Sequence, residues 1–285
     1  MQNLPSSNPL LGLMRKPKLK VKLPSQGKYW PAASIQLEEN NEYSVYSMTA
    51  KDEMLLKNPA SMTTGQTISS VIQSCIPSIK NANDTPSMDL DVLLLAIRIA
   101  TYGNKMTIPL KVLNIEFKHE VDLNEILENL YNTISWPELL VINNELSIFV
   151  RPLLYKQVAQ AGIETVETQK IMNIVNDDTI SEEKKLELFK NSFGKLTKIT
   201  IDVVTNSIEK IVSNDIEVTD PKYIQEFMEQ CDREVFNTIK NHIDAAIDNN
   251  GIQPITITAT PEMKKIGAED QLTVPIEFNL NNFFV

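Results

Sequence analysis

The chain has 285 residues, of which 42% are hydrophobic and 22% are charged, and its formal net charge is -10. This length and composition allow one large domain or two modest domains with a real core, and they exclude wholesale disorder. No apolar run approaches the length of a membrane span. Two cysteines, Cys75 and Cys231, exclude a disulfide framework and a four-cysteine metal site. A reducing compartment is therefore expected, and the sequence shows no secretory signal pattern at its start.

The charge is distributed unevenly along the chain. Residues 1–37 contain six of the 27 bases and no acid, which leaves 21 bases against all 37 acids and a net charge of -16 on the remainder. The six bases are Arg15, Lys16, Lys18, Lys20, Lys22 and Lys28. A basic segment beside a strongly acidic body fits an acidic protein surface better than nucleic acid, which usually needs a larger cationic surface.

Residues 1–37 are expected to be extended, because five prolines exclude a helix longer than one turn. Leu19, Val21 and Leu23 alternate with lysines, and this pattern predicts a half-buried strand with a cationic outer face. A turn is expected at 24–27, and strands at 34–37 and 43–46 would complete a small antiparallel sheet.

The region from Thr49 to Gly103 is expected to be helical. Thr49 with Asp52 and Thr63 with Gln66 have the spacing of capping boxes, and Ser87 is expected to cap a third helix. That third helix, at about 88–102, has so little polar surface that it should be the most buried helix.

The remaining patterns predict an α+β fold with small antiparallel sheets in the N-terminal half and at the C-terminus, a helical C-terminal half and an extended basic N-terminal arm. A hairpin is expected at 105–123 and a strand at 146–150. The expected helices are 155–175, 181–194, 196–212 and 221–247, although the β-branched run 199–204 also suits a strand. The predicted segments are the basic arm 1–37, a mixed α/β domain 38–152, a helical domain 153–250 and terminal strands with a tail 251–285.

Residues that carry chemistry are scarce. His119 and His242 have no metal-ligand partner nearby in the sequence, and both cysteines lie on apolar helix faces. The eight glycines form no phosphate-binding loop and no nucleophile elbow. The sequence therefore predicts no catalytic residue, no cofactor and no metal.

Aromatic pairs are the most informative features. Tyr29 and Trp30 follow a turn next to Lys28, and they are expected to be exposed and to bind a protein partner. The alternative is that both rings cover the small sheet. The apolar pair Phe283 and Phe284 should also dock on another surface. The predicted partner-binding residues are Lys18, Lys20, Lys22, Tyr29, Trp30, Phe283 and Phe284.

Short stretches in a fixed order along nearly the whole chain carry a resemblance to a known family. They are 8–13 (NPLLGL), 23–30 (LPSQGKYW), 46–53 (YSMTAKDE), 71–77 (VIQSCIP), 89–103 (DLDVLLLAIRIATYG), 224–227 (IQEF), 233–236 (REVF) and 282–284 (NFF). The chain resembles the baseplate hub and baseplate hub assembly proteins of T-even-type bacteriophages. Relatives often carry CxxC pairs where this chain has 115–119 and 258–262, so hairpins closed by ordinary turns are expected there.

The resemblance implies a structural component of a contractile-tail baseplate, in its hub region, with no catalytic residues to transfer. A transient assembly factor that leaves the mature virion is the alternative. A hydrolase and a nucleic-acid-binding protein are alternatives of other classes. The implied partners are other hub or wedge proteins, with the tape-measure protein and a homo-oligomer as further candidates and no membrane. The implied locations are the virion tail and, during assembly, the host cytoplasm.

Overall fold

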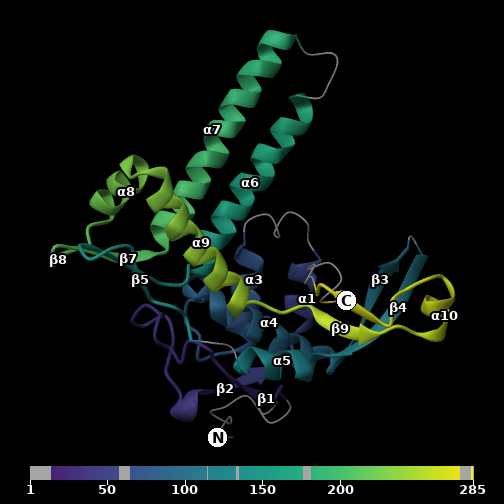
Figure 1. The fold of residues 1–285 in the computed structure, drawn as a ribbon. Coiled ribbons are helices and arrows are strands. Elements are labelled where there is room, and N and C mark those ends of the chain that lie inside the picture. The colour runs from purple at the N-terminus through teal and green to yellow at the C-terminus, as the bar shows by residue number, and fades with distance from the viewer. Residues whose placement is uncertain are drawn as a thin grey trace, which may run out of the picture.

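The computed structural model describes residues 14–57, 65–113, 115–132, 135–175, 181–276 and 284 (Figure 1). Its helices are α1 (Ala50–Leu56), α3 (Gln66–Cys75), α4 (Ser87–Tyr102), α5 (Leu123–Tyr131), α6 (Tyr155–Val175), α7 (Glu182–Asn206), α8 (Pro221–Gln230), α9 (Arg233–Asn250) and α10 (Pro261–Lys265). Its strands are β1 (Pro17–Lys22), β2 (Glu42–Tyr46), β3 (Lys105–Val112), β4 (Ile115–Asp122), β5 (Leu139–Val141), β6 (Leu146–Val150), β7 (Ile208–Ser213), β8 (Ile216–Val218), β9 (Ile255–Thr258) and β10 (Gln271–Val274).

The described sheets are small and antiparallel. The strand pairs β1–β2, β3–β4 and β9–β10 are two-stranded, and the fourth sheet has the order β5-β6-β7-β8. The predictions of a hairpin at 105–123, of a strand at 146–150 and of strands in the tail are confirmed. Helices occupy most of the C-terminal half, and the α+β class is confirmed as well.

A buried helix, α4, organises the first core. Leu93, Leu95 and Ile97 have no exposed surface, as the nearly continuous apolar run predicts. The helix contacts β1, β2, α3 and α5, and it ends at Gly103, whose φ of 90° suits a residue without a Cβ. The same cluster includes Ile257 and Phe284, so the C-terminal strands belong to this core.

A second core lies between the four-stranded sheet and the helices α7, α8 and α9. Its buried side chains include Ile148 and Ile211 from the sheet, Val204 from α7, Ile224 from α8 and Ile239 from α9. The strands of this sheet come from both sides of α6 and α7 in the sequence. These two helices lie side by side as a long hairpin that projects away from the rest of the chain (Figure 1).

Two predicted helix boundaries are wrong. The expected helices 181–194 and 196–212 are one helix, α7, followed by β7, since an isolated Gly194 is tolerated inside a helix and 208–213 pairs with β6. The expected helix 221–247 is broken at Cys231, whose φ of -67° and ψ of 159° are extended. The break allows Met228 of α8 and Ile243 of α9 to pack in the same core.

Three other local predictions concern the strand at 34–37, the capping boxes and the start of the third helix, and they are only partly confirmed. The expected strand 34–37 is reduced to an isolated bridge between Ile35 and Ile79. The capping box of Thr49 and Asp52 is confirmed, whereas Thr63 lies outside the described residues. A third helix begins at Ser87, but Pro86 occupies its N-cap position without a side-chain hydrogen bond. The prediction that Ser87 caps this helix is therefore wrong, and the N–H of Ser87 donates instead to the carbonyl oxygen of Leu153 at 2.7 Å.

The division into four segments stays a prediction, and two packing features bear on it. Val21 and Leu23, from the segment expected to be an extended arm, are buried in the first core. Residues 14–37 therefore pack on the body of the molecule. Strand β6 lies before residue 153 but contributes to the second core.

Candidate interaction surface

Strand β1 presents a row of lysines on its outer face. Val21 lies opposite Tyr43 of β2 and is buried, so the alternate residues Lys18, Lys20 and Lys22 are exposed. The ammonium group of Lys20 lies 3.2 Å from a carboxylate oxygen of Glu42. Among the described residues, no carboxylate lies within ion-pair distance of the other two. Strand β1 therefore carries positive charge that the described part of the chain neutralises only in part.

A chain of turns follows β1 and brings the aromatic pair onto α4. The N–H groups of Gln26 and Lys28 donate to the carbonyl oxygens of Leu23 and Ser25, each at 3.0 Å. Gly27 has a φ of 82°, and a Cβ there would lie 2.6 Å from Leu37. The positive φ favours glycine at this position, whereas the exposed side chain of Leu37 could move aside for a Cβ.

Trp30 is held by the buried carboxylate of Asp89. The indole Nε1 of Trp30 donates to Asp89 Oδ2 at 2.8 Å, and the N–H of Ser25 donates to Oδ1 at 2.8 Å. The hydroxyl of Ser25 also donates to Asp89. Burial raises the pKa of Asp89 to about 6, and these donors oppose that rise because they stabilise the ionised form. The prediction that Trp30 is exposed is wrong, since its side chain is 8% exposed and its polar atom is satisfied inside the chain.

Tyr29 is half-buried and lines a pocket of about 420 Å³. Its hydroxyl and the ammonium group of Lys28 both donate to Glu138, which directly precedes β5. Both donors lower the pKa of Glu138, whereas burial and the carboxylate raise the pKa of Tyr29. Tyr131 also lines the pocket and accepts a hydrogen bond of 3.3 Å from the N–H of Lys22. The pocket therefore adjoins the end of the lysine row.

Sequence reasoning missed Trp136, which also lines this pocket. Its side chain is 4% exposed and packs with Met88 of α4 and Ala246 of α9, while Tyr29 covers this small cluster. The indole N–H of Trp136 has no hydrogen-bond partner among the described residues. Nearby, a ring nitrogen of His242 lies 2.9 Å from the carbonyl oxygen of Pro137. A lone tryptophan in a segment without periodicity gave no signal for this position.

The predicted docking of the C-terminal aromatic pair can be checked for Phe284 but not for Phe283. Phe284 is buried in the first core, and its carbonyl oxygen accepts a hydrogen bond of 3.0 Å from the hydroxyl of Tyr102. Phe284 therefore docks on its own chain. Phe283 lies outside the described residues.

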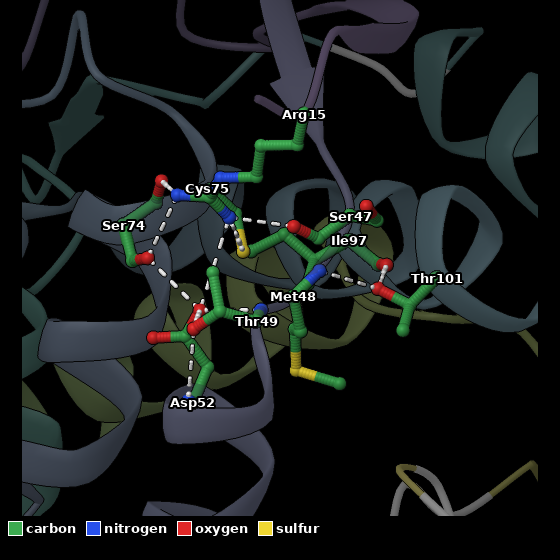
Figure 2. A network of polar contacts seen from close by, with 9 residues as sticks. All are labelled: Arg15, Ser47, Met48, Thr49, Asp52, Ser74, Cys75, Ile97 and Thr101. Carbon is green, nitrogen blue, oxygen red and sulfur yellow. Dashed lines mark hydrogen bonds and ion pairs between the residues drawn. The ribbon is translucent and has the colours of Figure 1, made fainter. Parts of the chain in front are cut away.

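Arg15 joins the segment before β1 to two helices (Figure 2). Its guanidinium donates to the carbonyl oxygen of Ser47 at 2.5 Å and to the Ser74 hydroxyl at 3.0 Å, and it lies 3.8 Å from Asp52. Asp52 also accepts from the N–H of Thr49 at 2.7 Å and from Ser74 at 2.9 Å. These contacts tie the segment before β1 to α1 and α3. The polar contacts of Arg15 are thus made within the chain, whereas Lys18 and Lys22 have no ion-pair partner among the described residues.

Cysteine and histidine do not gather into a reactive site in the described part of the chain. Cys75 is buried, as predicted, and burial raises the pKa of its thiol to about 11. Cys231 is only half-buried, because it lies at the break between α8 and α9. Across the described ranges, no three metal-ligating side chains come together, and no helix is both long and apolar enough to cross a membrane.

Comparisons with known proteins bear on the whole chain. A search of curated proteins and a search of solved structures each gave no match. A family model described as T4 bacteriophage base plate protein matches residues 14–284. This match includes β1, both cores, the projecting hairpin and the C-terminal strands. The chain therefore belongs to the family of T4 bacteriophage base plate proteins, which makes it a structural baseplate component of a phage tail.

Proposed function

We propose that this protein is a subunit of the hub region of a contractile-tail baseplate and binds neighbouring baseplate proteins during tail assembly. The observation that carries the proposal is the lysine row of β1, which is exposed next to the pocket lined by Tyr29. Lys18 and Lys22 have no ion-pair partner among the described residues, although the chain as a whole has a net charge of -10. A partner with an acidic surface would complement this row.

The pocket gives the partner a second point of attachment. Lys28, Tyr29 and Glu138 already hold one another, so the rim is formed before a partner arrives. A preformed recess lowers the entropic cost of binding. Candidate partners are other hub proteins, wedge proteins and the tape-measure protein, and a second copy of this chain is a further candidate.

The surroundings of the two aspartates with raised pKa values agree with a non-enzymatic role. Asp89 is fully buried, and both of its oxygens accept hydrogen bonds from Ser25 or Trp30, so it has no surface for a substrate. Asp91, whose pKa burial also raises to about 6, accepts from the backbone of Ile252. Two positions apart on α4, these acids lie on different faces of the helix and cannot act together. Nucleic acid is disfavoured by the acidic body.

Replacing Lys18, Lys20 and Lys22 by alanine tests the binding surface. Each candidate neighbour is co-expressed with the triple variant, and the affinity of the purified pair is measured at two salt concentrations. Binding should weaken roughly tenfold at low salt and lose much of its salt dependence. The matched control replaces Lys105, Lys111 and Lys118, which are exposed lysines of β3 and β4. Equal binding by both variants would remove the lysine row from the proposal.

Mass spectrometry of purified particles separates a resident subunit from a transient factor. A resident hub subunit is present in the mature tail in a fixed ratio to other hub proteins. A protein that is found only in assembly intermediates from the host cytoplasm, and never in mature particles, is an assembly factor. Binding to DNA that falls steeply with salt would instead favour the nucleic-acid alternative.

A further inference from the structure

A groove runs along strand β9, and strand β4 and helix α5 form its opposite wall (Figure 1). It consists of two adjoining hollows of about 470 and 290 Å³, and Ile126 of α5 and Thr256 of β9 line both of them. The buried side chains of Val121, Ile126 and Ile257 belong to the first core and give the groove an apolar lining. This β9 groove is therefore a preformed recess on the surface of the first core.

The edge of β9 that faces the groove has unpaired backbone groups. Strand β9 pairs with β10 alone, and the N–H of Ala259 donates to the carbonyl oxygen of Asp270 at 2.9 Å. Because hydrogen-bonded pairs alternate along an antiparallel ladder, the N–H and C=O groups of Thr256 and Thr258 point away from β10. Residues 255–258 all line the groove, which places the edge of the strand, and not one of its faces, against it.

The opposite wall contains a second open edge. Strand β4 pairs with β3 alone, and the N–H of Leu123 donates to the carbonyl oxygen of Asn104 at 2.7 Å. The same alternation directs the backbone groups of Glu120 away from β3, and residues 119–122 line the groove without interruption. An open strand edge binds extended backbone, because a second strand repeats donors and acceptors at the same spacing. The groove therefore suits an extended segment better than a helix.

Charge along the groove selects the side chains of that segment. Three acids, Glu120, Asp122 and Glu125, line it, and Lys105 is the base that lines it. The ammonium group of Lys105 lies 2.7 Å from Glu120. Asp122 accepts hydrogen bonds from neutral N–H groups, and no cation of the described residues lies within ion-pair distance of Glu125. With His119 neutral, the groove carries a net negative charge, which a segment with Lys or Arg would complement.

The other side of the two hairpins differs in both respects. A hollow of about 560 Å³ there is lined by residues 109–113 and 272–275, and its charged residues are Lys111 and Glu269. Its charge is therefore balanced. Pro109 occupies an outward position of β3, opposite Lys118, and offers no N–H to another strand. Proline on an edge is a common protection against strand pairing. The β9 groove is thus the side that is open to a basic strand.

We propose that the β9 groove binds an extended segment of another protein that carries Lys or Arg, and that this segment adds a strand to the edge of β9. The backbone groups of Thr256 and Thr258 bond to the backbone of the segment, and its basic side chains pair with Asp122 and Glu125. Alternate side chains of the segment pack towards Ile126. The groove is separate from the lysine row of β1 and from the pocket beside it, so the inference does not depend on the proposed function.

Two synthetic peptides of about seven residues, the length of an ordinary strand, test the proposal. Both have Val at alternate positions, and the positions between are Lys in one peptide and Glu in the other. Fluorescence anisotropy with the full chain at low salt should show the Lys peptide binding at least about tenfold more tightly than the Glu peptide. Equal affinity for the two peptides, or no binding of either, would overturn the proposal.

Proline substitutions test the backbone pairing. Thr256→Pro removes an N–H that β10 does not use, and it should weaken binding of the Lys peptide about tenfold. The matched control is Thr273→Pro, directly opposite on β10, where the lost N–H points to the other edge of the hairpin. This control should bind like the wild type. Equal losses in the two variants would exclude strand addition at β9, and so would undiminished binding by Thr256→Pro.

Charge reversal on α5 tests the acidic wall without altering a strand. Glu125→Lys should weaken binding of the Lys peptide about tenfold, whereas Glu128→Lys, an exposed position of the same helix outside the groove, should leave it unchanged. Equal effects of the two variants would mean that the peptide follows net charge and not the groove. A dimer seen by light scattering and lost in Glu125→Lys would assign the groove to a second copy. Circular dichroism compares the folding of all variants.

Discussion

Strand β1 and helix α7 both combine apolar residues with lysines, but they differ in whether the apolar side chains are buried. In β1, Val21 is buried against the first core while Lys18, Lys20 and Lys22 point outward. In the outer part of α7, Phe189 and Phe193 are exposed together with Lys190 and Lys195. The chain itself buries the apolar side of β1, whereas the outer part of α7 leaves apolar side chains exposed to water.

The difference follows from what surrounds each segment. Strand β1 lies on a body with a central buried helix, so period-two alternation divides its residues into a core face and a solvent face. The outer part of α7 has one neighbouring helix, which covers only one side of it. Mutations should therefore destabilise the fold around β1 and leave it intact in the outer hairpin.

The largest loss of stability is expected for Trp30→Ala. The change removes a buried ring and leaves Asp89 without one of its donors, so the free energy of unfolding should fall by about 3–5 kcal/mol. Urea denaturation measures this change in the free energy of unfolding. Tyr29→Ala, at the half-buried neighbouring position, should cost clearly less. Similar losses for the two variants would mean that Trp30 is not a core residue.

Asp89 should make stability depend on pH. Its pKa is raised from 3.8 to about 6 in the folded chain, so its contribution is fully present below pH 3.8 and is lost as the pH rises through about 6. The shift corresponds to about 3 kcal/mol. The difference in unfolding free energy between wild type and Asp89→Asn, measured from pH 4 to about pH 7, should change by an amount of that order. A constant difference would contradict the raised pKa.

Arg15→Ala should have an intermediate effect. It removes the donors that satisfy the Ser47 carbonyl oxygen and the Ser74 hydroxyl, and it takes a positive charge away from Asp52, at a cost of about 2 kcal/mol. Thermal unfolding checks this value. Lys16→Ala changes an exposed neighbour of the same charge and should leave the melting temperature unchanged. A matching drop for Lys16→Ala would show that the charge, and not the contacts, matters.

The smallest effect is expected for Phe193→Ala. The ring is 62% exposed, so its loss should change the free energy of unfolding by no more than about 0.5 kcal/mol. Solubility at high concentration should rise, because an exposed aromatic ring is removed. Leu188→Ala, on the half-buried face of the same helix, should be more destabilising. A large loss for Phe193→Ala would mean that its ring packs within the chain, and the contrast with β1 would fail.

Periodic segments could be predicted from the sequence, and isolated residues could not. The alternation in 105–123 and the apolar run of α4 each determine an element, because period and length act within a few residues. The break at Cys231 and the strand β7 depend on packing of α8, α9 and β7 with β6, which lies about 60 residues or more before them in the chain. Local propensity was overridden there by tertiary contacts.

The sequence by itself determined the α+β class, the central helix α4, the basic outer face of β1 and the resemblance to phage baseplate proteins. These properties depend on local spacing, on charge and on the order of short stretches. Only the tertiary structure decided which aromatic residues are available to a partner. It buries Trp30 on Asp89 and Phe284 in the core, and it leaves Phe189 and Phe193 exposed on a hairpin. Exposure depends on neighbours that are distant in the chain, and a pattern of residue types along one segment does not specify them.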